Sequence, residues 1–186
     1  MNVLIIGAGW FGCHIAKILH ETNINITIVE KQNKLFASMS GNNSNRLHRG
    51  FHYPRASLTR KQCILGFENF KKEYLFLCKK IKNNFIAIHK KSKINFSEYK
   101  NIMCLEGLNF KTAKNQYDLN NIDGIFKCSE ELIDFKKAKN FFMNYFISNK
   151  INLKLNTDFN KMKADLNKEY NFVVDCTACT LKKKFE

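Results

Sequence analysis

The sequence predicts an α/β fold built around a parallel β-sheet, and three features of its first thirty residues indicate it. Residues 3–6 form a continuous apolar run, which is typical of a strand covered on both faces. A glycine-rich turn follows, and apolar side chains then recur at helical spacing from Phe11 to Leu19. Residues 24–29 return to a β-branched pattern, so the whole segment is expected to form a β–α–β unit.

The remainder of the chain continues to alternate helical and extended patterns. Apolar positions every three or four residues predict one long helix over residues 59–81, with its aromatic stripe in the core. A polar stretch over residues 157–168 precedes the last predicted strand. The other elements are expected in the order strand 85–89, helix 97–104, loop and strand 121–128, helix 134–148, strand 151–155 and strand 172–175.

The composition is that of a globular protein, and the distribution of charge does not indicate a nucleic-acid-binding protein. At 186 residues the chain can bury a core, and 45% hydrophobic with 25% charged residues is ordinary for a globular protein. The net charge is +15, but the lysines are spread along the chain among many Asn, Ile and Phe residues, all with AT-rich codons. No nucleic-acid partner is therefore expected, although a basic surface still attracts anionic ligands. The charged runs 90–93 and 181–185 are interpreted as solvated surface.

Cysteine usage and apolar run length favour a cytoplasmic protein without a membrane span. Seven cysteines, an odd number without paired spacing, favour a reducing compartment over a disulfide framework. No apolar run reaches the ~18 residues that a membrane span requires. Cys176 and Cys179 form a CxxC pattern, but a second pair of zinc ligands and thioredoxin-like surroundings are missing. Chance spacing is the favoured interpretation, and no metal site is expected.

A glycine motif between the first strand and the first helix carries the strongest functional signal. Gly7, Gly9 and Gly12 form the pattern GxGxxG, and Glu30 ends the next strand 23 residues after Gly7. The pattern alone is weak, but a preceding strand, a following helix and a distal acidic residue together are typical of a dinucleotide-binding Rossmann-like fold.

Each residue of this motif has a separate physical purpose. Gly7 permits the tight turn, Gly9 lets backbone approach a pyrophosphate, and Gly12 lets the helix pack closely on the sheet. The helix N-terminus adds free N–H groups and a positive dipole end. Glu30 can accept hydrogen bonds from ribose hydroxyls and repels a 2′-phosphate, which favours FAD or NAD over NADP. A nucleotide-free turn of the same shape is the structural alternative.

The segment from Ser40 to Ala56 distinguishes the two cofactors. Its polar loop, rich in Asn and Ser, stands where an NAD dehydrogenase usually continues into another helix and strand, so FAD is favoured. In an extended chain Arg46, His48 and His52 would share one face, which suits a polar ligand. Gly50 and Pro54 disfavour the helix on which HxxxH pairs bind metals well, so no metal is expected here either.

These stretches together resemble a known family. The GAGWFG fingerprint, then ASMSGNNSNRLHRGFHYPRA, ELIDFKKAKNFF, INLKLNTDF and NFVVDCTA are similar to the N-terminal part of FAD-dependent oxidoreductases of the D-amino-acid-oxidase superfamily. The NRLHRGFHYPR string resembles more narrowly a bacterial subgroup often found among surface-polysaccharide genes. Members of the family continue beyond the last strand, so the chain is expected to be a truncated, N-terminal part.

The resemblance implies contacts to the phosphate and adenosine ends of FAD. Glu30 and Lys31 would flank the adenosine ribose, and the turn at Phe159 would offer backbone to the adenine. Thr177 and Ala178 would pack against the dinucleotide. The residues that would hold the pyrophosphate are Gly7, Gly9, Trp10, Phe11 and Gly12.

The resemblance also implies contacts near the flavin. Asn45, Arg46 and Leu47 would line the chain leading to it, and His48 would lie near the isoalloxazine ring. In domain terms, residues 1–84 would form the first segment of the FAD-binding domain and 151–186 its truncated second segment. Residues 85–150 would be part of an inserted α+β substrate-binding domain.

The expected activity is hydride transfer from a small CH–NH or CH–OH substrate to flavin. His48, His52 and Tyr53 are the candidates to bind or deprotonate that substrate, because imidazoles titrate near neutral pH. Two alternatives remain open at this point: a non-catalytic fragment of such an enzyme, and an NAD-linked dehydrogenase. The substrate, the electron acceptor and the oligomeric state are not defined by the sequence.

Overall fold

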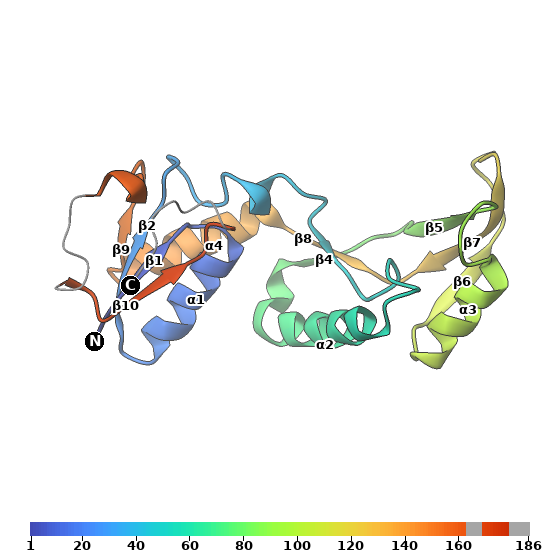
Figure 1. The fold of residues 1–186 in the computed structure, drawn as a ribbon, viewed down its shortest axis with the longest axis horizontal. Helices are drawn as coiled ribbons and strands as arrows, with labels where there is room; N and C mark the ends of the chain where they lie inside the picture. Colours follow the sequence, from blue (N-terminus) through green and yellow to red (C-terminus); the bar gives the residue numbers. More distant parts are fainter. Residues whose placement is uncertain (163–168, 179–186) are drawn as a thin grey trace. The chain divides into compact units, whose positions relative to one another are not determined.

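The computed structural model describes residues 1–162 and 169–178, and the described chain forms two compact units (Figure 1). The first unit contains Met1–Asn45 and the described residues from Phe135 onward, and the second contains Arg46–Asp134. Residues 163–168 of the predicted polar stretch, Cys179 of the CxxC pattern and the charged run 181–185 lie outside the described residues.

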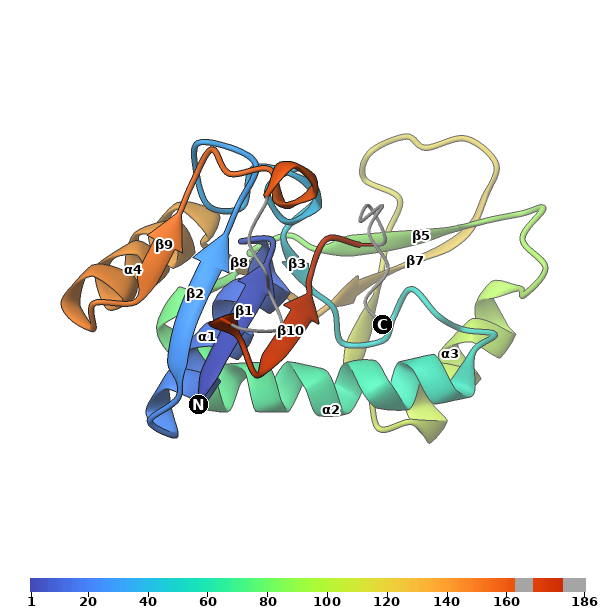
Figure 2. The same ribbon diagram turned by 60° about the vertical axis from the view of Figure 1, so that its left-hand side comes forward.

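The first unit contains a parallel sheet of the kind predicted. In the described ranges its strand order is β10 (Phe172–Asp175), β1 (Asn2–Ile6), β2 (Asn25–Val29) and β9 (Asn152–Lys154), which lie side by side in Figure 2. Ile6 pairs with Val29 on one side and with Asp175 on the other. Because all four strands are parallel, their carboxyl ends share one edge of the sheet, where the glycine turn begins.

Both faces of this sheet are covered, which explains the continuous apolar runs. Helix α1 (Trp10–Glu21) packs on the face that carries Ile5, where a Cβ built on Gly12 would lie 3.4 Å from the Ile5 side chain. On the other face a buried cluster combines Leu4, Ile6, Val29 and Phe159. Phe159 begins a short 3₁₀ helix, Phe159–Lys161.

Helix α4 (Phe135–Ser148) also belongs to the first unit. It buries Ala138, Phe142 and Phe146, and the Phe142 ring lies edge-on to Trp10 with 5.6 Å between ring centroids. Along the chain, the boundaries between the compact units fall at residues 45/46 and 134/135. The boundaries between the predicted functional segments fall at 84/85 and 150/151 instead. The assignment of those segments to FAD and to substrate stays a prediction.

The second unit combines antiparallel strands with two helices. Helices α2 (Ser57–Tyr74) and α3 (Phe96–Leu105) accompany two three-stranded sheets within the described residues. One sheet has the order β3 (Arg46–Leu47), β8 (Glu131–Ile133), β4 (Cys78–Lys80), and the other β5 (Phe85–His89), β7 (Ile122–Cys128), β6 (Phe110–Ala113). This arrangement of antiparallel strands and helices is α+β.

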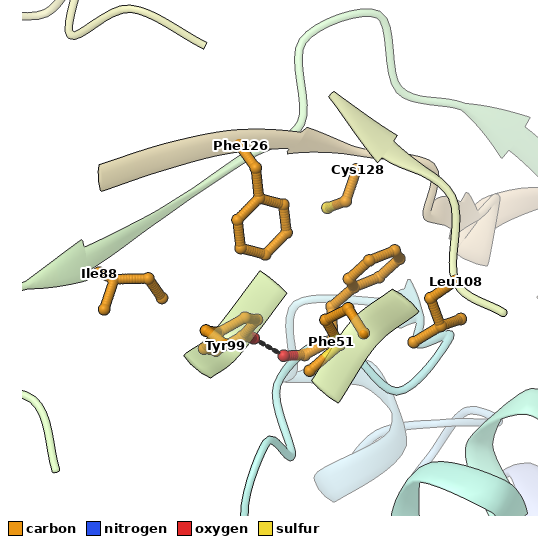
Figure 3. Close-up of a cluster of buried hydrophobic side chains, with 7 residues drawn as sticks. Phe51, Ile88, Tyr99, Leu108, Phe126 and Cys128 are labelled. Atoms are coloured by element: carbon orange, nitrogen blue, oxygen red, sulfur yellow. Dashed lines mark hydrogen bonds between the residues drawn. The ribbon is translucent and has the colours of Figure 1, made fainter. Parts of the chain in front are cut away.

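A hydrophobic cluster of the second unit anchors the histidine-rich segment. Figure 3 shows Phe51 packed with Phe126, Tyr99 and Leu108, and the Tyr99 hydroxyl donates a hydrogen bond to the Phe51 carbonyl oxygen. Phe51 and Phe126 are both completely buried. The backbone between His48 and His52 is therefore held by the core at its centre.

The predicted helix over residues 59–81 is wrong at its C-terminal end. Helix α2 ends at Tyr74, and a 3₁₀ turn, Leu75–Leu77, leads into β4. Residues 78–80 pair with β8 instead, so hydrogen bonding across strands overrides the helical spacing that Cys78 and Ile81 continue. In the part of the chain that the structure describes, no helix is both long enough and apolar enough to cross a bilayer.

Candidate functional site

The glycine turn has the geometry that requires glycine at two positions. Gly7 has a φ angle of +99°, and a Cβ built there would lie 2.9 Å from the Cys176 carbonyl oxygen. A Cβ on Gly12 would lie 1.9 Å from the Gly7 carbonyl oxygen. Backbone therefore packs against backbone at these two positions, which leaves no room for a side chain.

Gly9 lies where α1 begins, and a serine from a later loop contacts the same place. Ser40 Oγ accepts a hydrogen bond from the Trp10 backbone N–H at 2.9 Å, and a Cβ on Gly9 would lie 3.0 Å from that oxygen. Sequence analysis missed Ser40, because one serine in a loop rich in Asn and Ser gives no distinguishing signal. The first turn of α1 supplies further N–H groups of the kind that bind phosphate.

Glu30 lies directly against the glycine turn. Its Oε2 accepts a hydrogen bond from the Ala8 backbone N–H at 2.7 Å, and its Oε1 accepts one from the Gln32 N–H at 2.9 Å. Each carboxylate oxygen has a second lone pair, so hydroxyl donors can still bind. The carboxylate therefore lies beside the backbone that would contact a diphosphate.

The residues predicted around this turn occupy different environments. Lys31 is exposed, with its Nζ 3.6 Å from Asp158 Oδ2. Trp10 stacks on Phe36 at 5.8 Å between centroids, whereas Phe11 is 74% exposed. The Phe159 side chain is buried in the core, and the contact of its backbone with the adenine stays a prediction.

The segment after β10 reaches the same glycine turn. Thr177 lies next to Gly7, with its methyl carbon 3.6 Å from the position of a Gly7 Cβ. Its backbone N–H and its hydroxyl both donate to Asp175 Oδ1. Ala178 follows with a φ angle of +54°. The structure thus brings Thr177 to the turn, beside the place predicted for the dinucleotide.

In the second unit, two of the predicted catalytic residues meet around one buried carboxylate. The rings of His48 and His52 are perpendicular, with centroids 4.7 Å apart. Gly50 has a φ angle of +102°, and its carbonyl accepts from the Tyr53 N–H, so the chain turns between the two histidines. Glu130, whose side chain is 0% exposed, approaches both rings from the loop between β7 and β8.

The charges around Glu130 determine its ionisation. Burial raises the pKa of Glu130, but the His52 imidazole, the Arg49 backbone N–H and the charge of His48 outweigh burial and hold this pKa at about 2. Arg46 Nη1 lies 3.6 Å from Oε2 of the same carboxylate. Glu130 is therefore an anion surrounded by positively charged or hydrogen-donating groups. Sequence analysis did not single out Glu130, because the adjacent Glu131 is also acidic and no local pattern distinguishes the two residues.

The other residues predicted near the flavin are placed as follows. Arg46 Nη1 donates to the Oδ1 of the buried Asn84 at 2.7 Å, which fixes the guanidinium. Leu47 is buried in β3, and Tyr53 is 38% exposed. Asn45 has a φ angle of +51°, and its buried Oδ1 lacks a hydrogen-bond partner among the described residues.

The residues at the glycine turn and those around Glu130 can each be compared with the chemical group that they would bind. At the glycine turn, the backbone has no room for side chains at Gly7 and Gly12, and the Glu30 carboxylate lies next to it. Backbone of this kind fits a diphosphate, and the carboxylate fits the ribose of a dinucleotide. In the second unit, ligand-type atoms of His48, His52 and Glu130 lie within 4.8 Å of one another, which is compatible with a metal ion. The Arg46 guanidinium next to the same carboxylate opposes a divalent cation.

These features define a dinucleotide-binding protein of the α/β class. Comparison with known proteins specifies it further: the chain belongs to the FAD dependent oxidoreductase (DAO) family, whose model matches residues 2–100. It is 37% identical over 140 residues to the FAD-dependent monooxygenase FPY4 of Fusarium mangiferae. The aligned region covers 74% of this chain and 38% of that protein. It is 36% identical over 78 residues to the mitochondrial L-2-hydroxyglutarate dehydrogenase of Caenorhabditis briggsae, covering 39% and 18%.

Solved structures share the fold. L-alpha-glycerophosphate oxidase from Mycoplasma pneumoniae, a structure with FAD bound, superposes with a TM-score of 0.65 at 24% identity, covering 84% of this chain and 45% of that one. Glycine oxidase from Bacillus cereus gives a TM-score of 0.65 at 16% identity, covering 89% and 49%. The chain thus spans less than half of each of these proteins. The relatives do not support the narrower prediction of a bacterial surface-polysaccharide subgroup.

Proposed function

We propose that this chain binds FAD at the glycine turn and forms part of an oxidoreductase that oxidises a CH–NH or CH–OH group of a small molecule. The observation that carries the proposal is the hydrogen bond from Ala8 N–H to Glu30 Oε2 at 2.7 Å. It places a group suited to ribose hydroxyls beside backbone suited to a diphosphate. Family membership supports FAD over NAD.

Within this proposal the first unit binds the cofactor. Backbone of Gly7, Gly9 and the first turn of α1, at Trp10, Phe11 and Gly12, would hold the pyrophosphate. Glu30 would accept from the ribose hydroxyls, and Ser40, whose hydroxyl contacts the Trp10 N–H, would be an additional phosphate ligand. Bound FAD would supply the two-electron acceptor that amino-acid side chains lack.

The second unit contributes the groups proposed to act on substrate. His48 and His52 are 33% and 42% exposed at their side chains, so each ring can reach a ligand while contacting Glu130. An imidazole can take the proton that a CH–NH or CH–OH group loses on oxidation. Tyr53, partly exposed, would bind the substrate through its hydroxyl.

The domain assignment and the cellular location belong to the same proposal. Residues 1–84 and 151–186 would form the two segments of the FAD-binding domain, and residues 85–150 would form part of the substrate-binding domain. We also propose a cytoplasmic location, because the six cysteines in the described ranges are all free thiols, as in a reducing compartment.

The visible spectrum of the purified chain tests the cofactor assignment. A yellow flavin band that survives gel filtration is expected. Gly9→Val should abolish it, because the new side chain would stand at the surface where the pyrophosphate lies and within contact of Ser40. The matched control is Gly66→Val in α2, where a Cβ meets nothing within 4 Å, and this variant should keep the band.

The alternatives give different results in the same measurement. A colourless chain that ignores added FAD but binds NADH would be an NAD-linked protein, and one that binds neither would be a non-catalytic fragment. Flavin retention in Gly9→Val equal to that of the parent chain would contradict the placement of the pyrophosphate.

A further inference from the structure

Glu130 reaches the histidine segment from a distant part of the chain. The Glu130 carboxylate is completely buried, and Oε1 accepts a hydrogen bond from the Arg49 backbone N–H at 3.0 Å. This bond ties the carboxylate to the backbone between His48 and His52. Each imidazole therefore meets a carboxylate whose position is already fixed.

The two histidines approach this carboxylate with different atoms. Nδ1 of His48 lies 3.5 Å from Oε1, whereas Nε2 of His52 lies 3.6 Å from Oε2. These are ion-pair distances from which a small movement of either ring makes a hydrogen bond. Each ring thus faces a different carboxylate oxygen, so the two rings do not compete for the same lone pair. The planes of the two rings are perpendicular.

The chemistry of the three groups decides where the protons are. An ionised carboxylate only accepts hydrogen bonds, and a neutral imidazole donates through one nitrogen and accepts through the other. His48 Nδ1 and Glu130 Oε2 are buried atoms that lack another hydrogen-bond partner in the described part of the chain. Leaving them unpaired costs free energy, which a proton directed from each ring toward the carboxylate avoids.

We propose that Glu130 is a positioning residue that fixes opposite tautomers in the two histidines, with the proton on Nδ1 of His48 and on Nε2 of His52. Nε2 of His48 and Nδ1 of His52 are then the nitrogens that can accept a proton from a substrate, a consequence that rests on the function proposed above. A single carboxylate thereby sets the direction of proton acceptance for both rings.

A metal ion held by the same atoms would reverse this pattern. Metal-binding nitrogens carry no proton, so His48 would be protonated on Nε2 and His52 on Nδ1. Arg46 opposes this arrangement, because its Nη1 lies 3.6 Å from Glu130 Oε2 and already compensates the negative charge. The two interpretations therefore predict opposite tautomers at both rings.

Nitrogen NMR of the full chain distinguishes them without any cofactor. The 186-residue protein would be labelled with ¹⁵N-histidine, and long-range ¹H–¹⁵N spectra in alkaline solution would report the protonated nitrogen of each neutral ring. The chain has five histidines, and His48→Asn and His52→Asn assign the two signals of interest. We expect Nδ1–H for His48 and Nε2–H for His52, unchanged by a chelator. The reverse pattern, or a change on adding the chelator, would overturn the proposal.

Variants test whether Glu130 is the cause. Glu130→Ala should release both tautomers, and Glu130→Gln should retain only one, because an amide offers one acceptor and one donor. The matched control is Glu131→Gln, which removes the adjacent carboxylate that binds Lys71 at 2.7 Å and should leave both tautomers unchanged. Unchanged tautomers in the Glu130 variants would refute the assignment. If circular dichroism shows that the alanine variant does not fold, the glutamine variant decides the test.

Flavin retention separates this inference from the function on which it builds. The tautomers of His48 and His52 are measured by NMR without any cofactor, whereas the proposed function is measured by flavin retention of the parent chain. A parent chain that binds no FAD would defeat the proposed function and leave the tautomer result intact.

Discussion

Replacing Glu130 by glutamine removes a buried negative charge at nearly constant size, and its effect on stability should depend strongly on pH. The side chain is 0% exposed and has Arg46, His48 and His52 within 3.6 Å. Glutamine can still accept the hydrogen bond from the Arg49 N–H, but it loses the negative charge and one of the two acceptor oxygens. The parent chain should be more stable than the variant at mildly acid pH and lose this advantage in stronger acid.

The size of the effect follows from the ionisation of the carboxyl group. Burial opposes ionisation, yet the neighbouring imidazoles and the Arg49 N–H lower the pKa of Glu130 from 4.5 to about 2. At about 1.4 kcal/mol per pKa unit, the difference corresponds to at most about 3.5 kcal/mol of folding free energy. Because the folded pKa lies below the unfolded one, this contribution is complete above about pH 4.5 and is lost as the pH falls through about 2.

Urea unfolding followed by circular dichroism between pH 2 and pH 5 measures this difference. The free energies of unfolding of the two proteins should differ by about 2–3 kcal/mol at pH 5 and converge near pH 2. Glu68→Gln is the matched control, because Glu68 binds the Arg49 side chain at 3.1 Å but is 53% exposed. Removal of such an exposed ion pair should cost about 0.2–1 kcal/mol. Parallel pH profiles for the parent chain and Glu130→Gln would refute the reasoning.

Two further predictions concern the core of the second unit. Phe126→Ala should lower the free energy of unfolding by about 3–5 kcal/mol, because the ring is completely buried, whereas Leu105→Ala, at an 88% exposed position, should change it by under about 0.5 kcal/mol in the same urea assay. Burial, with the charge of Glu130, raises the pKa of the Cys128 thiol to about 12. Iodoacetamide at about pH 8 should therefore alkylate the exposed Cys104 on the order of a hundredfold faster than Cys128, measured by peptide mass mapping.

Local patterns were sufficient for the parallel sheet but not for the end of α2. The apolar runs that became β1 and β2 are short, are covered on both faces and lie next to the glycine turn, so neighbouring residues define them. Residues 78–80 continue a helical pattern, yet they form β4 because β8, about fifty residues later, supplies the hydrogen bonds. Pairing of this kind depends on chain segments that periodicity does not compare.

The candidate site divides in the same way. The contact between Glu30 and the glycine turn was predictable, because the spacing of one β–α–β unit fixes both. Sequence analysis also found His48 and His52, but it did not find that they meet, since the positive φ angle of Gly50 creates the turn between them. Glu130 and Ser40 reach their partners from other loops, and no local pattern identifies either one.

Glu30 in the first unit and Glu130 in the second differ in the groups that hold their carboxylates. Glu30 accepts hydrogen bonds from backbone N–H groups, which do not titrate between pH 5 and pH 9. Glu130 is surrounded mainly by side chains, two of which are the imidazoles of His48 and His52. The hydrogen bonds at the glycine turn therefore depend on the backbone, whereas those around Glu130 depend on the positions of neighbouring side chains. In the proposed function, the backbone would hold the cofactor, and side-chain hydrogen bonds would orient the groups that act on substrate.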